Sequence, residues 1–108
     1  MQKLVESFIA TANTFDVEGA LSLFSPDAVI DDVSVGDVFV GRAGIRIYLQ
    51  RFFVGYNTAS RLLSIETLDD FNLDVRLDFR GDFGHEIGIL KIAARSDGLI
   101  GRIDADLA

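Results

Sequence analysis

The sequence contains no cysteine, one proline and one histidine. Without cysteine the chain can form no disulfide and offers no thiol for nucleophilic or redox chemistry. A single proline and ten glycines in 108 residues exclude a long proline- or glycine-rich linker. His85 stands alone, with no second histidine or suitably spaced carboxylate to complete a metal site. We therefore expect a single domain over residues 1–108 that uses no metal and no cofactor.

Positive charge is also scarce, because ten Lys and Arg face seventeen Asp and Glu, for a net charge of -7. Binding to nucleic acid or to an anionic membrane needs clustered basic side chains, and those of this chain are dispersed. We expect neither as a partner. No long apolar run is present either, which predicts no membrane span and no secretory leader and makes a cytoplasmic location the default.

Apolar residues, which make up 49% of the chain, recur at helical spacing in three stretches before residue 55. The first stretch begins at Leu4, and Asp16 is a candidate N-cap for the second. Ser25-Pro26-Asp27 should end the second helix, because proline cannot continue it. The third helix has the clearest stripe, which comprises Ile45, Tyr48, Leu49, Phe52 and Phe53.

Strand patterns separate the second and third helices and follow the third. Residues 28–35 and 38–40 are rich in β-branched side chains around Gly36-Asp37, and this predicts a short hairpin. Residues 71–80 alternate strictly between apolar and polar, as a strand with one buried face does. Residues 60–68, 86–95 and 99–107 complete a predicted meander. Helices first and hairpin-linked strands afterwards indicate an α+β fold with an antiparallel sheet.

Three stretches, at residues 8–24, 26–32 and 39–53, and the turn at residues 96–100 resemble the nuclear-transport-factor-2-like (NTF2-like) superfamily. The similarity is to its SnoaL-like polyketide cyclase and ketosteroid isomerase branch. It implies three N-terminal helices packed on a curved, mostly antiparallel sheet, which form a cystatin-like cone with an apolar pocket. It also implies a small hydrophobic molecule as ligand and a homodimer as the assembly.

The resemblance places the general base of the isomerases on Asp32, in the segment Val29-Ile30-Asp31-Asp32. Adjacent strand residues point to opposite faces, so only one of the two aspartates can face the pocket. The oxyanion donors of the isomerases are missing, because Phe8 stands at one donor position and Lys91 falls near the other. Losing both removes a large catalytic contribution, so the usual isomerase activity is not expected.

Tyr48 and Lys91 are the candidates to replace these donors. Lys91 shares strand parity with Ile87, Ile89 and Ala93. If that parity faces the cavity, Asp32 is its natural partner; otherwise the Lys91 ammonium extends to the cavity mouth. Tyr48 lies in the apolar stripe of the third helix, where a buried hydroxyl needs a partner. His85, beside a glycine turn, is expected to be exposed.

Two functions remain open at this stage. One is a non-catalytic pocket protein for a small hydrophobic molecule. The other is a cofactor-independent isomerase, cyclase or hydrolase for a small carbonyl compound, with Asp32 as base and Lys91 or Tyr48 stabilising the anion. The residues expected to line the pocket are Phe8, Phe52, Phe53, Val75, Ile89, Ala93 and Ile103. The phenylalanines could instead fill it.

Overall fold

The computed structural model describes residues 1–108, and its first two helices follow the predicted stripes. Helix α1 spans Gln2–Asn13 and α2 spans Val17–Leu21. The Asp16 side chain caps α2 as predicted, since its Oδ1 accepts a hydrogen bond of 2.9 Å from the Gly19 N–H. The predicted end of α2 was wrong. The helix stops at Leu21, and Ser25-Pro26-Asp27 lies within the following strand.

The third helix, α3, spans Gly41–Leu49 and continues into one π-helical turn, η1, at Gln50–Val54. A hydrogen bond of 2.8 Å from the Gly55 N–H to the Gln50 carbonyl closes this wider turn. Such turns often occur at functional sites. Here the turn carries Phe52 and Phe53, which the stripe placed in the same helix.

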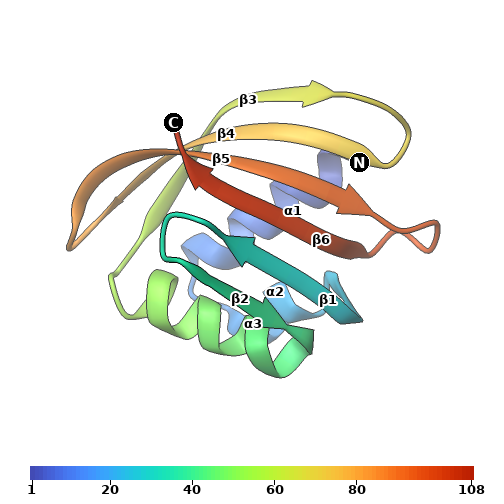
Figure 1. Ribbon diagram of the computed structural model, residues 1–108. Coiled ribbons are helices and arrows are strands. Elements are labelled where there is room, and N and C mark those ends of the chain that lie inside the picture. Colours follow the sequence, from blue (N-terminus) through green and yellow to red (C-terminus); the bar gives the residue numbers. More distant parts are fainter.

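Six strands form one sheet in the order β2-β1-β6-β5-β4-β3 (Figure 1). Their bounds are β1 Phe24–Asp32, β2 Asp37–Val40, β3 Ala59–Thr67, β4 Asn72–Gly81, β5 Gly84–Ala94 and β6 Ile100–Leu107. All neighbouring strands are antiparallel except β1 and β6, which run parallel. The sheet is therefore mixed and mostly antiparallel, and the parallel pair joins the early hairpin to the last strand.

The helices cover one face of this twisted sheet and leave the other open (Figure 1). A core of buried apolar side chains lies between the layers and includes Phe8, Phe24, Ile30, Ile45, Leu49, Leu73, Val75, Leu77, Ile92 and Ile103. None of the helices has both the length and the hydrophobicity needed to span a lipid bilayer. The inner face of the sheet thus supplies the floor of any cavity beneath the helices.

The predicted inward parity of strand β5 was wrong. Leu90 and Ile92 are buried against the helices, whereas Lys91 is exposed on the outer face. Lys91 lies between Asp74 of β4 and Asp104 of β6 in the pairing register. Ile89 and Ala93 share its side of the strand. The alternation predicted for β4 is confirmed, with Leu73, Val75 and Leu77 buried.

Candidate functional site

A cavity of about 330 Å³ opens between the π-helical turn, the end of β1 and the inner face of the sheet. Its buried wall includes Asp32, Tyr48, Phe53, Leu90 and Ala105. Its mouth is marked by exposed side chains, among them Tyr56, Phe83, Glu86 and Leu107. The size lies within the range of small-molecule sites, about 300–1,000 Å³.

Asp32 is the buried carboxylate of this cavity, with 6% of its surface exposed. It ends β1, where it faces inward beside Ala105 of β6 in the pairing register. Its Oδ1 accepts hydrogen bonds from the Ser34 N–H at 3.0 Å and the Ser34 hydroxyl at 2.6 Å. Its Oδ2 accepts a hydrogen bond of 2.6 Å from the Tyr48 hydroxyl. Three donors thus converge on one carboxylate at the cavity wall.

Tyr48 comes from α3 and is 8% exposed. Burial raises the pKa of its hydroxyl well above the ordinary 10.0, and the negative charge and hydrogen bond of Asp32 raise it further. The phenol therefore stays protonated and holds its proton toward Asp32. Its ring packs against Phe39 and Phe52, with ring centroids 5.0 and 5.2 Å away. These contacts fix the ring and therefore the position of the phenol oxygen beside Asp32.

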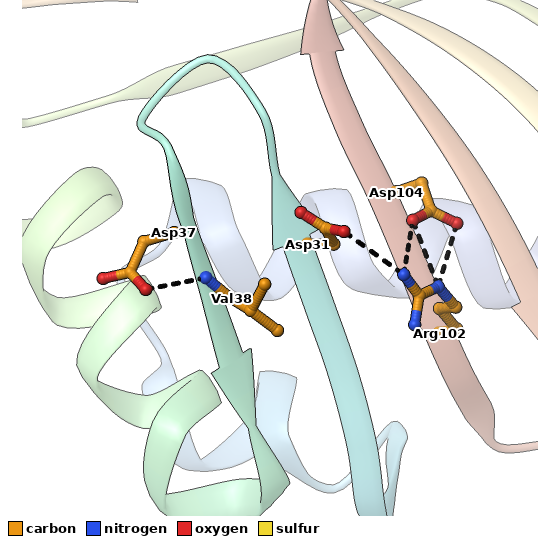
Figure 2. Close-up of polar contacts among 5 residues, drawn as sticks. All are labelled: Asp31, Asp37, Val38, Arg102 and Asp104. Atoms are coloured by element: carbon orange, nitrogen blue, oxygen red, sulfur yellow. Dashed lines mark hydrogen bonds and ion pairs between the residues drawn. The ribbon is translucent and has the colours of Figure 1, made fainter.

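The neighbouring aspartate points the other way. Asp31 lies on the outer face of the sheet, where its Oδ2 is 3.3 Å from the Arg102 guanidinium (Figure 2). The same guanidinium donates to Asp104, with hydrogen bonds of 2.9 to 3.1 Å. Figure 2 also shows that Asp37 accepts from the backbone N–H of Val38, at 2.8 Å. The expectation that only one of the paired aspartates faces inward is confirmed.

The remaining expected site residues divide into three groups. Phe52 and Phe53 line the cavity, as expected. Phe8, Val75 and Ile103 are buried in the core and do not reach it, because the helices and sheet close directly over them. Lys91, Ile89 and Ala93 are corrected to the outer face. The expected pair between Asp32 and Lys91 therefore does not form.

Several cavity residues were not expected from the sequence. Glu86 of β5 lies opposite Phe79 of β4 in the pairing register, and both line the cavity. Ser34 and Thr58 contribute hydroxyls from a turn and a loop. No alternation in β5 marked Glu86, because the central residues of this strand are almost uniformly apolar. No sequence pattern marks Thr58, which is placed by the chain leaving η1.

No cluster of three or more His, Asp or Glu side chains is arranged to hold a metal ion. His85 lies on the outer face, with its Nε2 2.5 Å from Oδ1 of the buried Asp78. Arg61 and Arg80 contact the other oxygen of Asp78, at 3.3 and 3.4 Å. Desolvation opposes the effect, but the Arg61 hydrogen bond and the His85 and Arg80 charges hold the pKa of Asp78 below its ordinary value.

The chain matches the SnoaL-like domain over residues 5–81, and no curated protein matches it by sequence. Among solved structures it is similar to the epoxide hydrolase/cyclase-like enzyme SalBIII of salinomycin pyran-ring formation. That match has 19% identity and a TM-score of 0.87, and covers 99% of this chain and 89% of the other.

Two further structures share the architecture. A candidate polyketide cyclase from Sinorhizobium meliloti has 20% identity and a TM-score of 0.86, over 97% of this chain and 94% of the other. RV0760c from Mycobacterium tuberculosis, in complex with estradiol-17beta-hemisuccinate, has 15% identity and a TM-score of 0.85, over 96% and 90%. Identities this low show a shared NTF2-like, cystatin-like fold. With the match over most of its length, the chain belongs to the SnoaL-like domain family.

Proposed function

We propose that this chain binds a small hydrophobic molecule in the cavity beside Asp32. The observation that carries the proposal is an open cavity of about 330 Å³ that the phenylalanines surround and do not fill. Phe8 packs in the core, and Phe52 and Phe53 form part of the wall. RV0760c, bound to a steroid ester, supports a ligand of this class. Apolar walls with a few placed polar groups are typical of such sites.

A neutral aromatic probe tests this proposal. Naphthol should bind the wild-type protein and shift the NMR signals of Tyr48 and Phe53. Ala105→Leu adds a side chain to the cavity wall and should abolish binding. Ala93→Leu makes the same change on the outer face and should leave binding intact. Unchanged naphthol binding by the Ala105 variant, or no binding by the wild type, would refute the proposal.

A second candidate function is a cofactor-independent isomerase, cyclase or hydrolase for a small carbonyl compound. The observation in its favour is a carboxylate that is 6% exposed, lies at a cavity wall and is oriented by a phenol. Asp32 would remove a proton from carbon. Lys91 is on the other face of the sheet, and Tyr48 borders the cavity but donates to Asp32. Tyr48 would therefore stabilise the anion only after Asp32 has taken up the substrate proton and released the phenol proton.

The catalytic candidate is tested by proton exchange. Tetralone, an enolisable aromatic ketone, would be incubated with the protein in D2O and its α-protons followed by NMR. Exchange faster than in buffer, lost in Asp32→Asn, is the expected result for a base in the cavity. Exchange at the buffer rate in the wild type would contradict the catalytic candidate and leave the binding proposal unaffected.

We also propose that two copies of the chain associate through the outer face of the sheet. One row of the register on this face carries four acidic side chains, namely Asp31, Asp104, Asp74 and Glu66, with Lys91 between Asp104 and Asp74. Arg61, Arg76 and Arg80 occupy another part. A two-fold axis could bring the acidic part of one copy over the basic part of the other. Sedimentation should show a dimer that weakens with salt, and a monomer at tens of micromolar would refute it.

A further inference from the structure

Most of the hydroxyl groups that line the cavity already donate their protons to other groups of the protein. Tyr48 donates to Asp32 Oδ2 at 2.6 Å, and Ser34 donates to Asp32 Oδ1 at 2.6 Å. Thr58 donates to the Phe52 carbonyl at 2.7 Å. A hydroxyl carries one proton, so each of these oxygens can only accept from a ligand. The exception is Tyr56, whose hydroxyl lies near the exposed mouth.

The charges around the cavity have one sign. Asp32 lies in the buried wall, and Glu86 shares the inner face with Phe79. The lining contains no lysine, arginine or histidine. Clefts lined by one sign of charge focus the field and attract ligands of the opposite sign.

Asp32 retains room for one more donor. An ionised carboxylate offers about four acceptor positions. Three are used, two on Oδ1 by Ser34 and one on Oδ2 by Tyr48. The open position is on Oδ2, beside the Tyr48 oxygen. A ligand group that donates to both Asp32 Oδ2 and the Tyr48 oxygen must carry at least two N–H or O–H bonds.

Aromatic rings make up much of the remaining wall: Tyr48, Phe52, Phe53, Tyr56, Phe79 and Phe83. They form a connected series, with centroid separations of 5.2 Å for Tyr48–Phe52 and 6.0 Å for Phe52–Tyr56. The faces of such rings carry negative charge density and attract ammonium groups, while their area suits an apolar body.

We propose that the cavity selects a hydrophobic amine, which is bound as its ammonium cation with the apolar body against the aromatic wall. This inference rests on the proposed binding function and adds the chemical class of the ligand. The ammonium group supplies several donors to an acceptor-lined site and neutralises the buried Asp32 carboxylate. A carboxylate ligand of the same shape meets like charge and almost no donor, so it is rejected.

Three probes of one skeleton test the inference: naphthylmethylamine, naphthylmethanol and naphthoate. Their dissociation constants would be measured by calorimetry at neutral pH, and NMR shifts of Tyr48 and Phe53 would locate them in the cavity. We expect the amine to bind at least tenfold more tightly than the alcohol, about 1.4 kcal/mol. Naphthoate should be the weakest of the three.

Two matched charge-removing variants separate the cavity from the protein's general acidity. Glu86→Gln, at the cavity mouth, should weaken binding of the amine at least threefold more than binding of the alcohol. Glu66→Gln, on β3 and outside the cavity lining, should change neither. Equal loss in both variants would show that overall negative charge, and not the cavity, attracts the amine, and would overturn the inference.

The remaining outcomes distinguish the inference from the proposal beneath it. If the alcohol or naphthoate binds in the cavity as tightly as the amine, the ligand class is wrong and hydrophobic binding stands. If none of the three shifts the cavity signals at millimolar concentration, both the ligand class and the binding function are refuted.

Discussion

Tyr48→Phe removes a single oxygen, and the structure gives the size of the resulting loss of stability. The Tyr48 hydroxyl is the donor to Asp32 Oδ2, and the other two donors both serve Oδ1. Phenylalanine keeps the ring contacts with Phe39 and Phe52. The variant therefore isolates one hydrogen bond to a carboxylate that is 6% exposed.

Hydrogen bonds to charged groups contribute about 1.5–3 kcal/mol. The cavity lets water reach Oδ2 in the variant, so the lower half of that range is expected for the loss in free energy of unfolding. With a shift of about 4–8 °C per kcal/mol for a domain near this size, the melting temperature should fall by at least about 6 °C. Urea unfolding followed by far-UV circular dichroism suits the measurement, because it does not depend on tyrosine fluorescence.

Tyr56→Phe is the matched control, since Tyr56 is 43% exposed and lines the same cavity. Loss of the Tyr56 hydroxyl should change the free energy of unfolding by less than about 0.5 kcal/mol. Equal stabilities of the two variants would refute the view that the phenol of Tyr48 holds Asp32. The ammonium-binding inference would then lose one of its supports, because it depends on Tyr48 donating its proton to Asp32.

Three other perturbations test separate parts of the structure. In Tyr56→Phe only Tyr48 remains to titrate, and its absorbance change on ionisation should occur well above pH 10 or on unfolding. Because folding raises this pKa, stability should fall as pH rises above about 10. Asp78→Asn should be less stable than wild type at neutral pH, with a difference that shrinks below pH 4, since folding lowers the pKa of Asp78. Gly88→Ala should lose about 1–3 kcal/mol, because the added Cβ would lie 2.3 Å from the Phe79 ring, and naphthol binding should weaken as that ring moves.

Each of these expectations has a clear contrary result. A tyrosine that ionises near pH 10 in the folded Tyr56 variant would place Tyr48 outside a buried, charged environment. A pH-independent difference for Asp78→Asn would mean that the carboxyl charge does not stabilise the outer-face cluster. For Gly88, the control is Gly101→Ala, whose Cβ would lie 3.0 Å from the flexible Arg95 side chain and 3.7 Å, an ordinary contact, from the Ala93 carbonyl. Equal losses in the two glycine variants would contradict the close packing of Phe79.

The elements were predictable because their signals are local. The α1 and α3 stripes and the β4 alternation each lie within one segment, and hydrophobic periodicity reports such faces directly. The parallel pairing of β1 with β6 joins segments about seventy residues apart. No local pattern encodes that pairing, so the mixed character of the sheet followed only from the structure.

Strand β5 shows why the sequence analysis assigned its side chains to the wrong faces of the sheet. Its central residues, Ile87 to Ala93, are almost uniformly apolar, so alternation could not distinguish its two faces. Tertiary packing decides between them. The Phe79 ring of β4 lies over Gly88, where no side chain interferes, and this fixes Gly88, Leu90 and Ile92 on the inner face. Lys91 has the opposite parity, so it points to the outer face of the sheet and away from the cavity.

The hydrogen bonds that make the cavity lining rich in acceptors also have both local and long-range causes. Ser34 follows Asp32 by two residues, and an aspartate that bonds the backbone two residues on is a common turn device visible in sequence. Tyr48 and Thr58 reach their acceptors only because α3 and η1 pack over the sheet. Asp32 could therefore be proposed as a pocket residue from sequence alone. The direction of each hydroxyl proton could not, and the proposal of an ammonium ligand depends on this direction.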